Sequence, residues 1–250
     1  MNSFISWVGG KRLLREEIIK RFPKKFNRYI EAFGGGAWVL FARDKHANTE
    51  IYNDANSELV NLFRCVKNHH RELENQLSFI LNSREVFNRL VNMHNLECLT
   101  DIQRAARFFY LIKMSYGSNC KDYCCIKKNV NTMVEYLTKV QNRLANVIIE
   151  HKDFQNLIQV YDREDALTYL DPPYYGAEKY YQNKFSEVDH KRLYSCLKNI
   201  KGKFILSYND CEFTRKLYKD FNIEGVQRQD SLRARYKTGN RYKELIIKNY

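Results

Sequence analysis

The 250-residue sequence lacks several features that mark whole classes of protein. No apolar run is long enough to span a membrane, and residues 1–14 lack the apolar core of a secretory signal peptide. Its seven cysteines are an odd number and are not grouped in pairs, which argues against a disulfide framework and for reduced thiols. We also find no internal repeats and no low-complexity segments. We therefore expect a cytoplasmic protein that does not bind membranes and is a monomer in solution.

A metal-ligand pattern is missing as well. Cys120, Cys124 and Cys125 are close in the sequence, but no CxxC pair elsewhere complements them. The adjacent histidines His69 and His70 are remote from these cysteines in the sequence. We therefore expect no metal ion in the protein.

Positive charge is the strongest feature of the composition. The chain has 42 Lys and Arg against 29 Asp and Glu, a formal net charge of +13, and its pI is about 9.3. Such a charge attracts phosphate-rich surfaces, so a polyanionic partner is the first hypothesis. A basic enzyme without such a partner has the same composition. The length suits one large domain, or one domain that carries a smaller insertion.

The most informative stretch is the apolar run Leu167–Leu170 followed by Asp171-Pro172-Pro173-Tyr174. The run predicts a buried strand, and the two prolines end it because they cannot donate to a neighbouring strand. Asp171 and Tyr174 are then presented at the open end of the strand. The alternative is that the prolines only stop the strand and that Asp171 caps the next segment of the chain.

This tetrapeptide suits the alkylation of an exocyclic amine on a flat ring. The nitrogen of such an amine is a poor nucleophile because its lone pair is delocalised into the ring. Asp171 and the Pro172 carbonyl are two acceptors that hold its N–H groups and favour a pyramidal nitrogen in the transition state. Tyr174 supplies a ring for stacking.

A second motif lies near the N-terminus. Tyr29–Phe33 predicts a strand, Gly34-Gly35-Gly36 a close approach of backbone to a nucleotide, and Ala37 the start of a helix. A second strand over Glu50–Asp54 ends in an acid about 20 residues after the glycines, the offset at which a carboxylate meets ribose hydroxyls. Val39 stands where a dinucleotide fingerprint has its third glycine. We therefore expect a smaller adenosine cofactor.

The remaining chain predicts an α/β sheet domain with a helical insertion. Apolar residues at helical spacing dominate 57–146, whereas strands and helices alternate before and after. We expect a catalytic and cofactor-binding domain of residues 1–56 and 147–250, with an inserted helical domain of residues 57–146. The elements expected in the second half are strands at 147–150, 167–170 and 204–207, helices at 187–200, capped by Ser186, and at 211–221, and a hairpin that pairs 233–236 with 241–247.

One loop of the insertion mixes basic and aromatic residues. It runs from Ser115 to Tyr123 and is followed by Lys127 and Lys128. This mixture fits contact with nucleic acid, although a solvated loop has the same composition. The residues that we expect to contact nucleic acid are Ser118, Asn119, Lys121, Lys127, Lys128, Arg233 and Arg235.

Four ordered motifs resemble the DNA adenine-N6 methyltransferases of the Dam type. Trp7-Val8-Gly9-Gly10-Lys11 resembles the W-x-G-G-K motif of that family, and Phe33–Gly36 its F-x-G-x-G loop. Asn53–Asn56 is similar to its acidic segment, and Asp171–Tyr174 is its catalytic motif unchanged. The order also matches, with cofactor motifs first, then a target-recognition insertion, then the catalytic half.

The resemblance implies a Rossmann-like fold that binds S-adenosyl-L-methionine and methylates an adenine flipped out of duplex DNA. The implied catalytic residues are Asp171, Pro172, Pro173 and Tyr174. The implied cofactor-binding residues are Trp7, Gly10, Lys11, Phe33, Gly34, Gly35, Gly36, Asp54, Asp153, Phe154 and Asp171. On its own, Trp7 is better explained as a packing residue.

Two departures from the family bear on the DNA site. Ser6 stands where the family has a basic residue before the tryptophan, and the segment from Ser118 to Tyr123 replaces its reading loop. Recognition of GATC or of a related site is therefore left open. The alternatives are a related enzyme that methylates RNA or protein glutamine, and a DNA-binding protein without catalysis. Asp171 favours a DNA adenine, because the RNA and protein enzymes more often carry Asn there.

Overall fold

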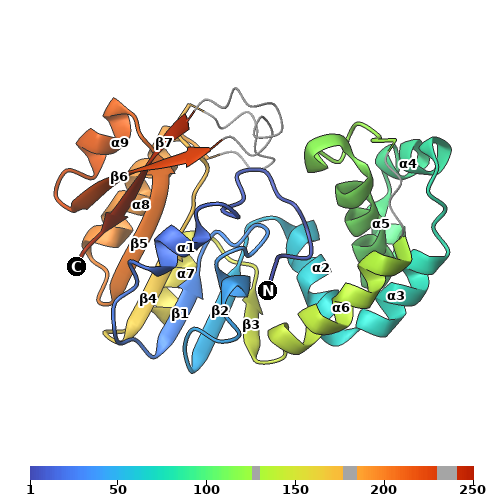
Figure 1. Ribbon diagram of the computed structural model, residues 1–250, viewed down its shortest axis with the longest axis horizontal. Coiled ribbons are helices and arrows are strands. Elements are labelled where there is room, and N and C mark those ends of the chain that lie inside the picture. The colour runs from blue at the N-terminus through green and yellow to red at the C-terminus, as the bar shows by residue number, and fades with distance from the viewer. Residues whose placement is uncertain (126–129, 177–184, 230–240) are drawn as a thin grey trace.

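The computed structural model describes residues 1–125, 130–176, 185–229 and 241–250 (Figure 1). Seven strands form one sheet in the order β3-β2-β1-β4-β5-β7-β6. They are β1 Arg28–Glu31, β2 Thr49–Asn53, β3 Val147–Glu150, β4 Ala166–Leu170, β5 Lys203–Asn209, β6 Asn222–Gln229 and β7 Arg241–Lys248. Strands β1 to β5 pair in parallel, whereas β7 is antiparallel to both β5 and β6. This is the Rossmann-like α/β sheet that the resemblance implied.

The strand order places the two sequence motifs side by side. The chain leaves β1 toward β2 and β3, then returns to the other side of β1 with β4. Ligands of open α/β sheets bind at such a reversal, outside the carboxyl ends of the strands. The glycine loop follows β1 and Asp171 follows β4. The topology therefore explains why segments far apart in sequence meet.

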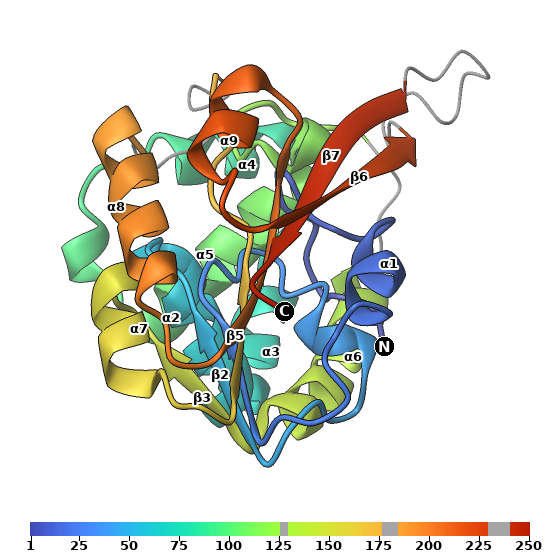
Figure 2. The same ribbon diagram turned by 90° about the vertical axis from the view of Figure 1, so that its left-hand side faces the viewer.

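Helices cover both faces of the sheet. The side chains of a strand alternate between faces: Tyr29 and Tyr52 pack in one core with the helical region, and Ile30 and Ile51 pack in a second core under two other helices. Figure 2 shows α1 (Arg15–Ile19) on one side and α7 (Phe154–Tyr161) and α8 (Glu187–Lys198) on the other. A further helix of this part is α9 (Glu212–Leu217). All five residues of β4 are buried, as expected for a strand covered on both faces.

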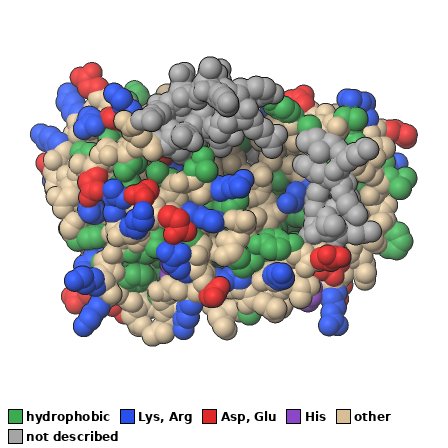
Figure 3. All heavy atoms as spheres, viewed as in Figure 1, with side chains coloured by type: hydrophobic (Ala, Val, Ile, Leu, Met, Phe, Trp, Pro, Cys, Tyr) green, Lys and Arg blue, Asp and Glu red, His purple; other side chains and the backbone are tan. Residues whose placement is uncertain are grey.

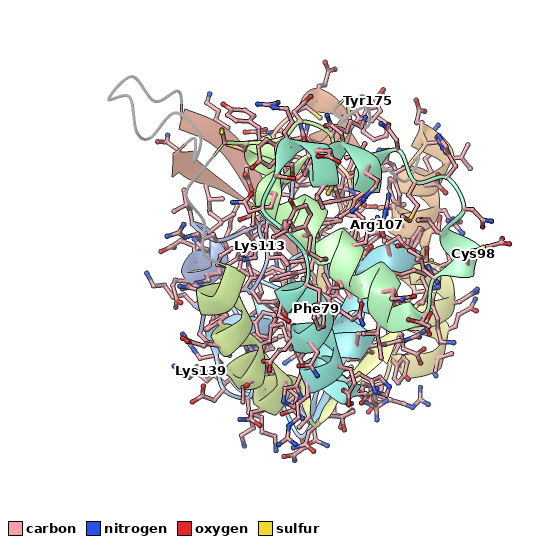
Figure 4. The ribbon with its side chains drawn as sticks, turned by 90° about the vertical axis from the view of Figure 1, so that its right-hand side faces the viewer. Phe79, Cys98, Arg107, Lys113, Lys139 and Tyr175 are labelled. Atoms are coloured by element: carbon pink, nitrogen blue, oxygen red, sulfur yellow. The ribbon has the colours of Figure 1, made fainter. Side chains whose placement is uncertain are left out.

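The segment between β2 and β3 is helical and lies beyond β3 in Figure 1. Its helices are α2 Ser57–Asn68, α3 His70–Ser78, α4 Arg84–Val91, α5 Asp101–Met114 and α6 Val130–Leu144. Side chains cap the starts of α2 and α5, since Asn56 accepts from Leu59 N–H and Thr100 forms a capping box with Gln103. Figure 4 views this side, with Arg107 and Lys113 on α5 and the exposed Phe79 after α3.

These helices share a core with the sheet. Leu59 and Phe63 of α2 and Phe109 of α5 belong to the same buried cluster as Tyr29 of β1. A smaller cluster of Phe87, Tyr110, Leu111 and Met114 supports the loop after α5. Among the described residues, no helix has the length and apolarity needed to cross a membrane.

Most of the expected elements are present, and two expectations are wrong. No helix starts at Ala37: its φ is 54°, its N–H donates to Gly34 O (2.7 Å) to close a turn, and only a 3-10 turn, Leu40–Ala42, follows. The C-terminal hairpin pairs β7 with β6, Asn222–Gln229, and not with 233–236. Residues 233–236 lie outside the described residues. The sequence did not predict β6 as a strand, because it contains Gly225 and charged residues, which are uncommon in strands.

Two helix boundaries also differ. The helix expected at 211–221 is confined to Glu212–Leu217, and that expected at 187–200 ends at Lys198. The predicted cap of α8 is confirmed, because the Ser186 side chain accepts from Asp189 N–H.

Candidate active site

A cavity lies at the carboxyl ends of β1, β2 and β4. Its wall is built from six separate segments of the chain, and it includes every implied cofactor residue. The lining residues are Trp7, Val8, Gly9, Gly10, Lys11, Glu31, Ala32, Phe33, Gly34, Gly35, Gly36, Trp38, Val39, Asn53, Asp54, Ala55, Asn56, Lys152, Asp153, Phe154, Tyr169, Asp171, Pro173, Phe185, Asp189 and Arg192. The cavity therefore brings the N-terminal motif, the glycine loop and the tetrapeptide together.

The glycine loop is held by close contacts that a side chain would break. A Cβ added to Gly34 would lie 2.1 Å from a ring carbon of Tyr52. Gly35 has a φ of 48° and donates its N–H to Asp54 Oδ2 (2.8 Å). Three consecutive glycines therefore let the backbone form the cavity wall itself.

Asp54 ties the end of β2 to this loop. Its Oδ2 accepts from Gly35 N–H and its Oδ1 accepts from Asn56 N–H (2.8 Å). Burial raises the pKa of this carboxyl, and the two backbone N–H groups partly offset the rise. A carboxylate has about four acceptor sites, so acceptor capacity remains for a hydroxyl group in the cavity.

Trp7 and Gly10 form the part of the wall that packs against the glycine loop and Trp38. A Cβ on Gly35 would lie 2.7 Å from the Trp7 ring, and one on Gly10 would lie 2.8 Å from the ring of Trp38. Trp7 also makes an edge contact with Phe108, with ring centroids 6.2 Å apart. Trp7 therefore both packs against Phe108 and lines the cavity.

Asp171 is held by a buried ion pair. Lys11 Nζ lies 2.6 Å from Oδ1 and 2.7 Å from Oδ2 of Asp171, and it also donates to Gly9 O (2.8 Å). Ser207 of β5 donates its hydroxyl to Asp171 Oδ1 (3.0 Å). Burial raises the pKa of Asp171, whereas Lys11 acts against the rise. The carboxylate is thus fixed at the edge of the cavity.

The rest of the tetrapeptide is arranged around this pair. Pro172 is buried, and Pro173 lines the cavity. Tyr174 does not line the cavity: its ring stacks on Tyr208 (centroids 5.7 Å apart) and its hydroxyl donates to the buried Glu244 (2.8 Å). Lys11 Nζ lies 4.8 Å from the centre of the Tyr174 ring.

Aromatic rings fill the far end of the cavity. Phe154 contacts Phe33 and Phe185, with ring centroids 5.6 and 5.8 Å apart. Asp153 precedes them as the N-cap of α7, where its Oδ1 accepts from Gln155 N–H (2.9 Å). These rings give the cavity an apolar part, the aromatic slot, which has the Asp153 carboxylate beside it.

Sequence reasoning missed several residues of the site. Glu31 is almost wholly buried at the end of β1, and burial raises its pKa to about 8. Its Oε2 accepts from the Tyr29 hydroxyl and from Leu40 N–H, both at 2.9 Å. An acid inside an apolar strand just before the glycines was the available signal. No comparable signal marked Ser207, Glu244 and Arg192.

The candidate DNA loop lies outside the cavity and is held by its own side chains. Asn119 Oδ1 accepts from Lys121 N–H (2.9 Å) and Asp122 N–H (3.0 Å), and its amide donates to Asp122 Oδ2 (2.6 Å). Ser118 has a φ of 60°, and Lys121 is exposed. Asn119 therefore stabilises the loop. The other four candidates, Lys127, Lys128, Arg233 and Arg235, lie outside the described residues.

The surface is basic without a single dense patch on the face seen in Figure 3, where Lys and Arg are spread among Asp and Glu. Within the described ranges, no three His, Cys, Asp or Glu side chains are grouped to hold a metal ion.

Comparison with known families decides what the cavity serves. A model of the D12 class N6 adenine-specific DNA methyltransferases matches residues 7–232. The chain belongs to this family. It is an adenine-specific DNA methyltransferase that uses S-adenosyl-L-methionine, as the resemblance to Dam-type enzymes implied.

Family relatives cover the whole chain. A type II methyltransferase of Lactococcus lactis subsp. cremoris, M1.LlaDCHI, is 27% identical over 100% of this chain and 96% of its own length. A DNA adenine methylase of Haemophilus influenzae is 26% identical over 97% of this chain and 92% of its own. A DNA N-6-adenine-methyltransferase of Escherichia phage P1 is 25% identical over 89% of this chain but 32% of its own length. The relatives thus include enzymes named as a type II methyltransferase, a DNA adenine methylase and a phage methyltransferase.

The cavity fits S-adenosyl-L-methionine chemically. Asp54 retains acceptor capacity for ribose hydroxyls, the glycine backbone allows close approach, and Phe33 and Phe154 supply apolar ring surface in the cavity wall for a flat ring. Lys11 and Asp171 form an ion pair in the wall of the same cavity.

Proposed function

We propose that this enzyme methylates N6 of an adenine rotated out of duplex DNA, and that the reaction takes place beside Asp171. One observation carries the proposal: Asp171 lies at the edge of the same cavity as the glycine loop and Asp54. An acceptor for the target amine is thereby next to the site for the methyl donor. A duplex base reaches such a recessed group only when it leaves the stack.

The cofactor residues are assigned by position in the cavity. We propose that Asp54 accepts the ribose hydroxyls, that Phe33, Asp153 and Phe154 bind the adenine ring, and that Lys11 faces the methionine part. Trp7, Gly10 and residues 34–36 shape the wall between these ends. Bound S-adenosylmethionine supplies an activated methyl group.

The protein's part in the chemistry is to localise the nitrogen lone pair. Asp171 accepts one N–H of the target amine, and the Pro172 carbonyl accepts the other. Oδ1 of Asp171 accepts from Lys11 and Ser207, whereas Oδ2 accepts from Lys11 alone, so Oδ2 retains an acceptor site for the amine N–H. Two fixed acceptors then stabilise the developing positive charge on nitrogen. Tyr174, held by Glu244 and Tyr208, keeps a defined ring next to this point.

Recognition of the DNA sequence is assigned to the helical segment. We propose that residues 57–146 form the target-recognition insertion and that 1–56 and 147–250 form the catalytic part. The exposed Lys121 and the structured loop around Ser118 support contact with DNA. The net charge of +13 supports binding to duplex phosphates. We propose a monomer that acts in the cytoplasm on GATC or a related site.

The test is to incubate the protein with DNA and isotopically labelled S-adenosylmethionine, then to map methylated bases by sequencing. We expect label on adenine N6 within one short recurring sequence, and none on DNA whose target adenines were methylated beforehand. Label on RNA or on protein glutamine instead of DNA would replace this function with a related one. Binding of DNA and cofactor without transfer would reduce the protein to a binding module.

A further inference from the structure

Helix α8 contributes a cation to the cavity wall that no motif marks. Arg192 lines the cavity and donates from Nη1 to Asp153 Oδ1 (3.1 Å) and from Nη2 to Asp153 Oδ2 (2.8 Å). Such a two-point contact fixes the plane of a carboxylate as well as its position. Asp153 and Arg192 are 39 positions apart in the chain.

The contacts leave Asp153 with a defined free acceptor site. Its Oδ1 accepts from Gln155 N–H and from Arg192 Nη1, and its Oδ2 accepts from Arg192 Nη2 alone. Because a carboxylate has about four acceptor sites, Oδ2 retains one. Without Arg192, only the single bond to Gln155 would orient the group.

The same arginine borders the aromatic slot. Its guanidinium lies 4.4 Å from the centre of the Phe154 ring, and Phe154 is buried against Phe33 and Phe185. Its Nε is buried and has no hydrogen-bond partner among the described residues. An apolar slot with a fixed acceptor and a spare donor matches the edge of a purine that bears an amine.

A further contact holds Arg192 in place from its own helix. Asp189 Oδ1 accepts from Arg192 Nη2 (3.0 Å), and Asp189 Oδ2 accepts from both the N–H and the hydroxyl of Ser186 (2.8 Å each). The capping box of α8 thereby anchors the arginine. Two carboxylates and one guanidinium leave the cluster with one net negative charge, which favours a donor over an acceptor on the bound ring.

We infer that Arg192 is a positioning residue that makes the cofactor site select an adenine-type ring, by orienting Asp153 toward the 6-amino group. This rests on the proposed function, since it assumes that the adenosine end of the cofactor binds at Phe154. A 6-oxo purine presents an oxygen to Asp153 and is disfavoured there, because two acceptors face each other.

The test is calorimetric binding of S-adenosylhomocysteine and of S-inosylhomocysteine, its 6-oxo analogue. The wild-type protein should bind the adenosyl compound at least about tenfold more tightly. Arg192→Gln should weaken the adenosyl compound by about 10- to 100-fold, the range for lost hydrogen bonds to a charged group, and weaken the inosyl compound much less. Asp189→Asn removes only one anchor of Arg192 and should give a smaller change of the same kind.

A matched control lies next to it. Lys191→Gln removes an exposed ion pair with Glu187 (2.6 Å) on the same helix and should leave both affinities unchanged. The inference would be overturned if folded Arg192→Gln bound both compounds with unchanged affinity, or if it lost the same affinity for each. Either result would show that Arg192 has no role in selecting the adenosyl compound. If the wild-type protein binds neither compound, the proposed cofactor site itself is wrong. If it binds both equally, only the selection by Asp153 and Arg192 is wrong.

Discussion

The ammonium of Lys11 lies between both carboxylate oxygens of Asp171, at 2.6 and 2.7 Å, although the two residues are 160 positions apart. The pair is nearly inaccessible on the lysine side, where 4% of the side chain is exposed. A buried charge pair of this kind is costly to break by removing one partner. A substitution that removes either side chain alone would therefore leave the other charge buried without its partner.

Lys11 should set the pH range in which the enzyme works. Burial raises the pKa of Asp171 and Lys11 opposes the rise, and Asp171 must be ionised to accept an N–H. Activity is thus lost as the pH falls through the pKa of Asp171. Lys11→Met removes the opposing charge, so the pKa rises further. We expect the acid limb of the single-turnover rate to move to higher pH at saturating cofactor.

The control for this prediction is Lys20→Met, which removes the exposed pair with Glu17 and should leave the acid limb in place. An acid limb that is the same in Lys11→Met and in the wild type would mean that Lys11 does not keep Asp171 ionised.

Glu31 should make folding stability fall with rising pH. Its pKa is about 8 in the folded protein against 4.5 in the unfolded chain, so between these values the unfolded state releases a proton that the folded state keeps. Stability is full below pH 4.5 and declines up to about pH 8, by at most about 1.4 kcal/mol per pH unit from this group. Glu31→Gln keeps an acceptor for Tyr29 and Leu40 but has no proton to release. We expect its Tm to vary less over this range.

Thermal unfolding of both proteins from pH 5 to pH 8 measures the effect, with the exposed Glu164→Gln as the control. Parallel pH profiles for Glu31→Gln and wild type would show that Glu31 is ionised in the folded state.

Gly34→Ala should damage the cofactor loop. The added Cβ would lie 2.1 Å from a Tyr52 ring carbon, and Tyr52 is itself fully buried. Overpacking of this kind costs about 1–3 kcal/mol, and the displaced loop should weaken cofactor binding. Denaturant unfolding and calorimetry measure the two effects. Gly225→Ala is the control, because a Cβ added there has open space around it. Equal changes in stability and in cofactor affinity for the two variants would show that Gly34 is not crowded by Tyr52.

Lys121 should contribute to the salt dependence of DNA binding. Each displaced phosphate counterion adds roughly 0.9 to the slope of log affinity against log salt. If exposed Lys121 contacts one phosphate, Lys121→Gln lowers the slope by about that amount. Lys139→Gln on α6, away from this loop in Figure 4, is the control. A slope that is unchanged in the Lys121 variant would place the contact elsewhere.

The sequence predicted the parts of the site that are local in the chain. The strand before Asp171, the three glycines and the acid Asp54 are each visible as a short pattern, and the order of α/β elements places them at one sheet edge. Local patterns failed where a residue's role depends on a distant partner. Ser207 and Arg192 look like ordinary surface residues until β5 and α8 bring them to Asp171 and Asp153.

Two local patterns also misled. The glycine loop predicted a helix at Ala37, but the turn closed by Gly34 O gives Ala37 a left-handed conformation that stops a helix. The sequence also placed Asp171 at the open end of a strand without indicating a partner for it, whereas Lys11 and Ser207 both bond to it. Replacing Asp171 by Ala would leave Lys11 buried without its partner, so a milder change is needed.

The most direct measurement is single-turnover methyl transfer by Asp171→Asn at saturating cofactor and DNA. The amide keeps the shape and leaves an oxygen for Lys11, but it removes the negative charge that the target amine needs. Circular dichroism and calorimetric cofactor binding verify folding and saturation, and Asp210→Asn, after the neighbouring β5 and paired with Arg215, is the matched control. We predict a rate lower by about 10² to 10³, as for loss of a preorganised polar group, and an unaffected control. A folded, saturated Asp171→Asn enzyme within about tenfold of the wild-type rate would contradict the role of Asp171.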